Sequence, residues 1–304
     1  MHPAWSIIFF TTVSGLGFGF STWIVFGLID IKNISQLIII AGFAFCLICS
    51  GLISSTLHLG HPERAWRALS QWRTSWLSRE GVLSVFVLTA LTCWFLYTFQ
   101  YGKIPLWINL TIMILILFTV YATAMIYASL KTVASWNQFL TPVCYLMFSI
   151  SGGLLAIIWF MSIIGQMITF NITLILLLLI VSTWIFKLKW WWNLDNSKLE
   201  SSLETATGLG SFGEVRSLMP PHTSENYLQK EMGFVIARKH VMKLRLLSIT
   251  LGGIIPSIIL LSGTLSFISL GIALFIHLVG VFIERFLFFA EAKHVVTLYY
   301  GKKN

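Results

Sequence analysis

Long apolar runs recur along the whole chain, and each is long enough to cross a membrane as a helix. A spanning helix needs about 20 mostly apolar residues to cross the hydrocarbon core, and it satisfies its backbone hydrogen bonds internally where water is absent. The runs are continuously apolar and do not alternate in polarity, which excludes the strands of a membrane barrel. The runs lie near residues 5–29, 35–58, 80–101, 105–130, 139–163, 166–187, 245–263 and 266–290. We therefore predict an all-α, polytopic membrane protein, an eight-transmembrane-helix bundle forming a single integral membrane domain over residues 1–304.

Positive charges are distributed unequally between the two sides of this predicted bundle. With eight spans, the N-terminus, loops 59–79, 131–138 and 188–244, and the C-terminal tail share one side. All but Lys32 and Lys103 of the 20 Lys and Arg residues fall on that side. Cytoplasmic loops carry such an excess, so we expect both termini in the cytoplasm and the protein in the cell's inner (cytoplasmic) membrane. This topology also explains the net charge of +9 without a nucleic-acid partner. A large partner is expected on this side, which has the only long loop, 188–244.

Two titratable residues frame the short polar loop 59–79. His58 ends the second span, where an imidazole can exchange a proton near neutral pH, as a quinone reaction requires. The alternative is an interfacial histidine that hydrogen-bonds a loop. Glu80 begins the third span, where a carboxylate is costly and needs a partner or a water path. The alternative is that Ser78 caps this helix and Glu80 complements its dipole.

The loop itself is rich in arginine and tryptophan. Residues 61–64, His-Pro-Glu-Arg, predict a turn that opens a short interfacial helix. The tryptophans associated with it are typical of an aromatic belt: Trp66, Trp72 and Trp76. Arg64 and Arg67 can hold anionic lipid or the carboxylates of a partner. Because the loop has more arginines than orientation requires, we favour partner docking.

The last span contains an ionic pair, Glu284 and Arg285, which is a functional-site hypothesis within a membrane. The alternative is mutual neutralisation that holds helices together. His277 is expected to make a polar contact in the core. The glycines of the stretch 15–19, Gly-Leu-Gly-Phe-Gly, lie in an apolar helix and predict close helix packing instead of nucleotide binding.

The chain offers few ligands for a metal. Its cysteines lie within predicted spans, where we interpret them as small apolar side chains: Cys46, Cys49, Cys93 and Cys144. Their spacing does not suit an iron–sulfur cluster. His277 is the lone histidine in the middle of a span, so we predict no haem. A haem-b quinol cytochrome and a secondary transporter stay as alternative classes, although inverted repeats and broken helices are not evident.

Over nearly its whole length the chain resembles the membrane-anchor subunit of the dimethyl sulfoxide reductase (molybdopterin oxidoreductase) family, the DmsC type. The motifs that carry the resemblance are residues 1–12, Leu57-His-Leu-Gly60, Pro62-Glu-Arg-Ala-Trp66, Trp76-Leu-Ser-Arg-Glu80, Thr132-Val-Ala-Ser-Trp136 with Thr141-Pro142, and Arg285 with the aromatic residues after it.

The resemblance implies a haem-free anchor with eight spans. Its partners would be a catalytic subunit with molybdenum (Mo-bisMGD) and an electron-transfer subunit with [4Fe-4S] clusters. The anchor would exchange electrons with quinone or quinol, either menaquinone or ubiquinone. His58 matches the family histidine of the quinol site, and Glu80 matches the carboxylate near it. Arg64, Arg67 and Arg285 are weaker candidates for the quinone site or for partner docking.

Two stretches are more similar to one branch of the family. His61-Pro62-Glu63-Arg64 and residues 288–294, Phe-Phe-Ala-Glu-Ala-Lys-His, resemble the anchors of cytoplasm-facing sulfite dehydrogenases. We therefore expect quinone reduction coupled to sulfite oxidation. The alternative is an anchor that oxidises quinol for a dimethyl sulfoxide reductase.

Overall fold

The computed structural model confirms the all-α prediction. It describes residues 5–57, 59, 61–102, 104–196, 202–216, 218–219, 239–292 and 295. Within this part of the chain, eight helical segments are long and apolar enough to cross a membrane. They are α1 (Trp5–Phe26), α2 (Ile34–Thr56), α3 (Trp76–Tyr101), α4 (Leu106–Ala128), α5 (Leu140–Ile163), α6 (Phe170–Asn196), the continuous segment α10–η2–α11 (Val241–Ile249, Thr250–Ile254, Ile255–Leu261) and α12 (Phe267–Ala290). Two short helices, η1 (Pro62–Gln71) and α7 (Leu203–Thr207), lie between spans.

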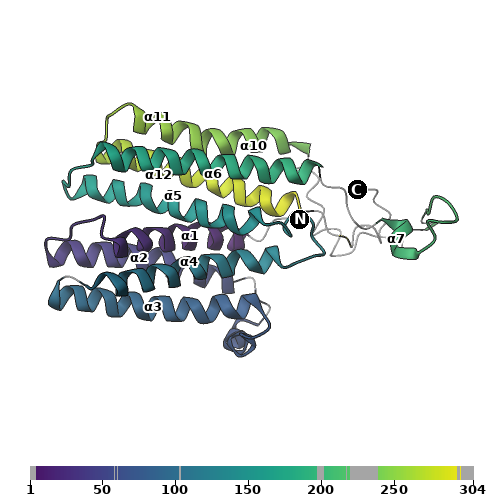
Figure 1. Ribbon diagram of the computed structural model, residues 1–304, viewed down its shortest axis with the longest axis horizontal. Coiled ribbons are helices and arrows are strands. Elements are labelled where there is room, and N and C mark those ends of the chain that lie inside the picture. The colour runs from purple at the N-terminus through teal and green to yellow at the C-terminus, as the bar shows by residue number, and fades with distance from the viewer. Residues whose placement is uncertain are drawn as a thin grey trace.

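The eight spans run side by side, with α3 at one edge of the bundle and α10–α11 at the other (Figure 1). Helices α1 and α5 form its centre, since 72% and 67% of their apolar windows are buried, against 28% in α3 and α6. The outer helices expose large apolar side chains such as Phe86 and Leu96. Such an exterior suits lipid, which is as apolar as these side chains.

Glycines bring α1 into backbone contact with its neighbours. A Cβ added to Gly19 would lie 1.8 Å from the carbonyl oxygen of Ser149 on α5, and one added to Gly153 would lie 2.2 Å from the carbonyl carbon of Gly19. Ser149 Oγ also donates a hydrogen bond of 2.6 Å to the carbonyl of Gly15. The predicted packing role of the glycine stretch is therefore confirmed.

A second glycine contact joins the last two spans. Between α10 and α11 the helix widens into the π-helical turn η2, which contains Gly252. A Cβ on Gly280 of α12 would lie 2.1 Å from the Gly252 nitrogen. His277 Nδ1 lies 2.6 Å from the Gly252 carbonyl oxygen, which confirms the expected polar contact in the core.

The spans around the long loop extend further than the sequence predicted. Helix α6 continues past residue 187 to Asn196, and α10 begins at Val241, so the loop is shorter than residues 188–244. The extension of α6 follows from its packing, because Trp190 and Trp191 are buried.

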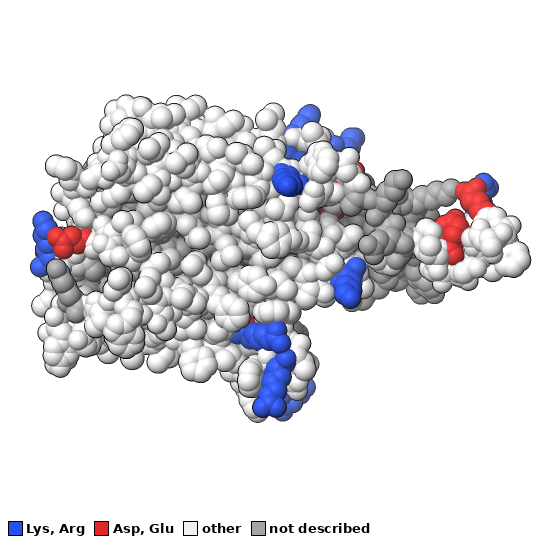
Figure 2. Space-filling view, viewed as in Figure 1, with Lys and Arg blue, Asp and Glu red and all other residues white. Residues whose placement is uncertain are grey.

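Basic side chains gather mainly at one end of the bundle, and a small patch of both charges marks the opposite end (Figure 2). The first end, here called the basic end, includes η1 and the start of α3. The opposite end includes the connection between α1 and α2, with Asp30 and Lys32.

Replacing Gly19 by alanine is expected to destabilise the bundle, because the added Cβ would collide with the α5 backbone. Overpacking a close-packed interior costs about 1–3 kcal/mol of unfolding free energy, and backbone cannot rotate away as a side chain can. Thermal unfolding of the detergent-purified protein measures the effect. Gly42→Ala is the matched control, because nothing lies within 4 Å of its Cβ position. Equal unfolding temperatures for the two variants would contradict the Gly19 contact.

Candidate functional site

The predicted interfacial helix is confirmed as the 3₁₀ helix η1, in which Pro62 occupies the first turn. None of its residues is buried. His61 Nδ1 lies 3.0 Å from Glu63 Oε1 ahead of this helix. His58, the candidate predicted to end the second span, lies outside the described residues.

Arginines and tryptophans pair along this loop. The Arg67 guanidinium lies 5.6 Å from the centre of the Trp66 ring, and the Arg79 guanidinium lies 4.3 Å from that of Trp76. Arg79 also donates hydrogen bonds to the carbonyls of Trp72 and Arg73, so it holds the loop against α3. Arg64 and Arg67 are exposed, so both can meet lipid or a partner.

The start of α3 differs from the expected cap. The helix begins at Trp76, and its N-cap residue is Ser75. Ser78 lies inside the helix, where its hydroxyl donates a hydrogen bond to the carbonyl of Ala68 in η1. The Ser78 hydroxyl, which was expected to cap α3, thus links η1 to α3.

Glu80 is buried, with 5% of its surface exposed. Its Oε1 accepts a hydrogen bond of 2.5 Å from the hydroxyl of Thr123 on α4. The same hydroxyl lies 3.1 Å from the Thr119 carbonyl. Because Glu80 lies inside the bundle, it is not merely a surface charge that complements the helix dipole. The sequence gives no sign of Thr123, since a threonine in an apolar helix usually bonds its own backbone.

Tyr127 and Tyr145 lie near both Glu80 and Arg285, within electrostatic range of each. The Arg285 guanidinium stacks 3.8 Å from the centre of the Tyr145 ring. Arg285 is only 2% exposed, so it lies inside the bundle and away from its surface. The structure thus brings Glu80 and Arg285 to one interior region and leaves Arg64 and Arg67 outside it.

Aromatic residues enclose this region at the basic end. The Tyr127 ring packs against the rings of Trp136 and Phe288, with centroids 5.3 Å and 5.4 Å away. Trp136 Nε1 donates a hydrogen bond of 2.8 Å to the Phe288 carbonyl. Trp190 Nε1 donates to Thr141 Oγ1 over 3.0 Å. Motif residues that are distant in the sequence therefore meet around Tyr127.

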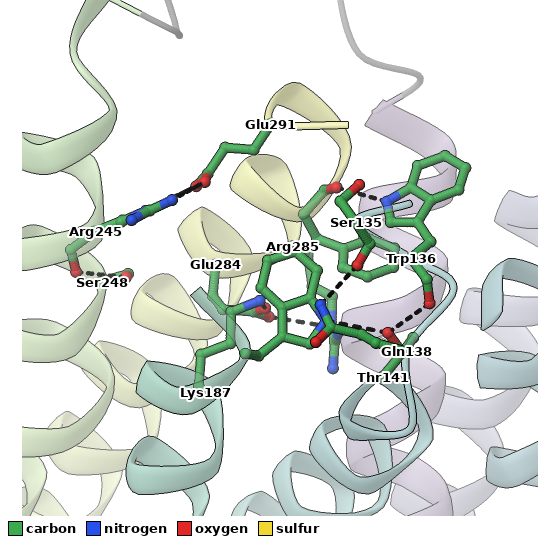
Figure 3. Close-up of polar contacts among 12 residues, drawn as sticks. Ser135, Trp136, Gln138, Thr141, Lys187, Arg245, Ser248, Glu284, Arg285 and Glu291 are labelled. Atoms are coloured by element: carbon green, nitrogen blue, oxygen red, sulfur yellow. Dashed lines mark hydrogen bonds and ion pairs between the residues drawn. The ribbon is translucent and has the colours of Figure 1, made fainter. Parts of the chain in front are cut away.

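A buried lysine completes the ionic pair of the last span. Lys187 Nζ lies 2.5 Å from Glu284 Oε1, and Arg285 Nε lies 3.4 Å from Glu284 Oε2. The three side chains converge between α6 and α12 (Figure 3). The Lys187 ammonium also lies 3.7 Å from the centre of the Trp190 ring. Lys187 was not a predicted site residue, because it stood at the end of a predicted span, where a lysine is typical of the membrane surface.

A second ion cluster lies beside the first at the basic end. The Arg245 guanidinium makes two hydrogen bonds to Asp195, of 2.6 Å and 2.9 Å, and also binds Glu291. Burial raises the pKa of the Glu291 carboxyl, although the nearby Arg245 guanidinium opposes this change. The cluster joins α6, α10 and the end of α12 (Figure 3). Sequence reasoning missed it because its members come from three separate segments.

Within the described part of the chain, no group of three or more His, Cys, Asp or Glu side chains is placed to hold a metal ion. All four cysteines are free thiols. The side chains that this region does bring together are a buried carboxyl, a threonine hydroxyl and buried cations, which are suited to acid–base chemistry.

Comparison with known proteins identifies the family. The family model for the DMSO reductase anchor subunit (DmsC) matches residues 1–301. The chain belongs to this family. A curated relative, a sulfite dehydrogenase subunit of Allochromatium vinosum, is 32% identical over 338 aligned positions, which cover 99% of each chain. No solved structure matches.

Membership makes the chain a multi-pass membrane protein and an anchor subunit of an oxidoreductase. An anchor of this family works with catalytic and electron-transfer subunits. The match gives no support to the transporter or the haem-b cytochrome alternative.

Replacing Glu284 by glutamine is expected to destabilise the protein, because Lys187 would be left buried without its counter-ion. Losing one partner of a buried pair costs about 3–5 kcal/mol. Adding Lys187→Met should restore only part of the loss, since it removes the unpaired ammonium but leaves the Arg285 guanidinium without the Glu284 carboxylate. Detergent unfolding of the purified protein measures these changes.

Glu214→Gln is the control for that experiment. It breaks the exposed contact with Arg216, of 3.2 Å, which is worth at most about 1 kcal/mol. A Glu284→Gln variant as stable as this control would show that the buried pair contributes little.

Proposed function

We propose that this anchor exchanges electrons and protons with quinone at the basic end of α2 and α3. The observation that carries the proposal is Glu80, a carboxyl group buried beside the loop with its hydrogen bond to Thr123. A buried carboxyl in a span marks a proton relay or an ion site, and its neighbours here include no metal-binding group within the described residues.

The proton steps follow from the chemistry of quinone. Its reduction to quinol takes up two electrons and two protons, so a nearby acid must supply each proton. In our proposal His58 exchanges the first proton with the quinone headgroup. Glu80 lies behind the surface and relays protons between this site and water.

Electrons reach or leave the quinone through partner subunits. We propose an iron–sulfur subunit docked at the basic end and a molybdenum catalytic subunit beyond it, because those cofactors supply the redox chemistry. Arg64 and Arg67 are exposed on η1 and can bind carboxylates of the docked subunit. By the positive-inside rule, this end faces the cytoplasm and the protein resides in the cytoplasmic membrane.

Sulfite is the substrate that we favour for the complex. The Allochromatium vinosum relative is a sulfite dehydrogenase subunit and aligns with almost the whole chain. Oxidation of sulfite with one water gives sulfate, two electrons and two protons, and the two electrons are those that one quinone accepts. Dimethyl sulfoxide reduction by quinol is the second candidate, because the family model describes a DMSO reductase anchor.

His58→Ala and Glu80→Gln are expected to lower quinone-coupled turnover of the purified complex by roughly 100-fold or more, because acid–base groups contribute at least that much. Activity with an artificial dye should persist, since the dye takes electrons before they reach the anchor. The assay compares sulfite with quinone against dimethyl sulfoxide with quinol. Asp30→Asn, at the opposite end, is the control. Unchanged quinone kinetics in His58→Ala would overturn the proposed site.

Replacing both Arg64 and Arg67 by glutamate is expected to weaken attachment of the partner subunits. Negative charges on the anchor would then face the carboxylates of the docked subunit. Co-purification at increasing salt measures the attachment, and the variant complex should separate at lower salt than the wild type. Lys32→Glu makes an equivalent change at the opposite end and serves as the control. Equal retention of the partners in both variants would exclude docking through these two arginines.

A further inference from the structure

A cleft of about 670 Å³ opens at the end of the bundle opposite the basic end. It lies between the end of α1, the start of α2, the end of α3 and the start of α4. Sites for small molecules measure roughly 300–1,000 Å³, so the cleft has room for a sizeable ligand. Because all four helices begin or end here, it lies where the lipid headgroups meet water. Exposed Tyr101 and Trp107, at the ends of α3 and α4 beside it, are typical of that level.

The described lining carries one charge of each sign. Asp30 and Lys32, in the connection between α1 and α2, line the cleft and are exposed. Neither forms an ion pair within the part of the chain that the structure describes. A ligand that uses both groups must therefore carry a cation and an anion of its own.

Two side-chain amides of the lining keep their donors available. Trp94 Nε1 donates a hydrogen bond of 2.9 Å to Asn109 Oδ1, and an indole can only donate, so the NH₂ group of Asn109 is left for another acceptor. Asn33 Oδ1 likewise accepts from the Gln36 backbone as the N-cap of α2, which leaves its own NH₂ group. The N-terminus of α2 also lies in the lining, and a helix N-terminus favours an anion. These donors suit a phosphate group.

We propose that this cleft binds a zwitterionic phospholipid with a primary amine. Its phosphate oxygens accept hydrogen bonds from the Lys32 ammonium and from the amides of Asn33 and Asn109. Its ammonium group donates to the Asp30 carboxylate. The lipid thereby joins the pair α1–α2 to the pair α3–α4 at the membrane surface. The inference is independent of the proposed quinone site, which lies at the other end of the bundle.

The apolar part of the lining matches the rest of such a lipid. Ile24, Val25 and Leu37 are buried in it and suit acyl chains. Ile34 and Phe99 line the cleft and are each 56% exposed, so it is open to the surrounding lipid.

Other occupants of similar size use less of the lining. A quinone ring has no charge for Asp30 or Lys32. An anionic phospholipid would place its phosphate near the Asp30 carboxylate without a cation between them, and like charges repel. A choline headgroup has a cation but no N–H group to donate to that carboxylate.

The test uses the full-length protein in its complex, purified in detergent and freed of lipid. It is mixed with phosphatidylethanolamine, phosphatidylcholine or phosphatidylglycerol of identical acyl chains, or with menaquinone, and native mass spectrometry counts the bound molecules. We expect one phosphatidylethanolamine, held about tenfold more tightly than the other lipids, as one additional hydrogen bond to a charged group can provide.

Two variants separate the roles of the charges. Lys32→Gln should weaken binding of all three phospholipids, because each has the phosphate. Asp30→Asn should remove the preference for phosphatidylethanolamine and leave the other two bound as before. Lys131→Gln is the matched control, because this exposed lysine lies in the loop after α4 and does not line the cleft. All three replaced residues are exposed, and equal unfolding temperatures of the lipid-free proteins verify that the variants fold.

Several results would overturn the inference. It fails if phosphatidylethanolamine binds no better than the other two lipids, or if Lys32→Gln and Lys131→Gln retain it equally. Displacement of the bound lipid by menaquinone would make the cleft a quinone site instead. None of these results bears on the site proposed at His58 and Glu80, which is tested by quinone-coupled turnover.

Discussion

The direct contact between the backbones of α1 and α5 holds the centre of this bundle together. In lipid there is no hydrophobic force to press apolar helices against each other, so close packing must supply the attraction. Gly19 and Gly153 remove the side chains that would separate these two helices.

Buried charge is the second constraint, and it is met by local compensation. Lys187 and Arg285 flank Glu284, and the rings of Trp190 and Tyr145 cover the two cations. Aromatic faces attract cations most strongly where water is excluded. The ion cluster around Arg245 then fastens α6 and α10 to the end of α12 at the basic end. Charged and aromatic side chains thus hold the second half of the bundle together with the glycine contact between η2 and α12.

Hydropathy was sufficient to predict the eight spans, because lipid forces each one to be long and apolar. It failed at the end of α6, where Lys187 interrupts the apolar run although the helix continues. A lysine there is typical of a membrane surface, and only tertiary contacts with Glu284 and the tryptophans keep it buried. Glu80 was predicted as a candidate from its charge. Its partner Thr123 was not, because an uncharged hydroxyl in an apolar helix carries no signal of what it faces.

The shallow position of Glu80 has an electrical consequence. It lies four residues into α3, about 6 Å along the helix axis, in a membrane with a hydrocarbon core of about 30 Å. Under the proposed function, and with the start of α3 taken as the membrane surface, a proton passing between Glu80 and the basic end would cross roughly a fifth of the membrane voltage. Since a full crossing is worth about 2.3 kcal/mol per 100 mV, the field acts on this step by only about 0.5 kcal/mol. The proposed proton exchange would therefore depend only weakly on the membrane voltage.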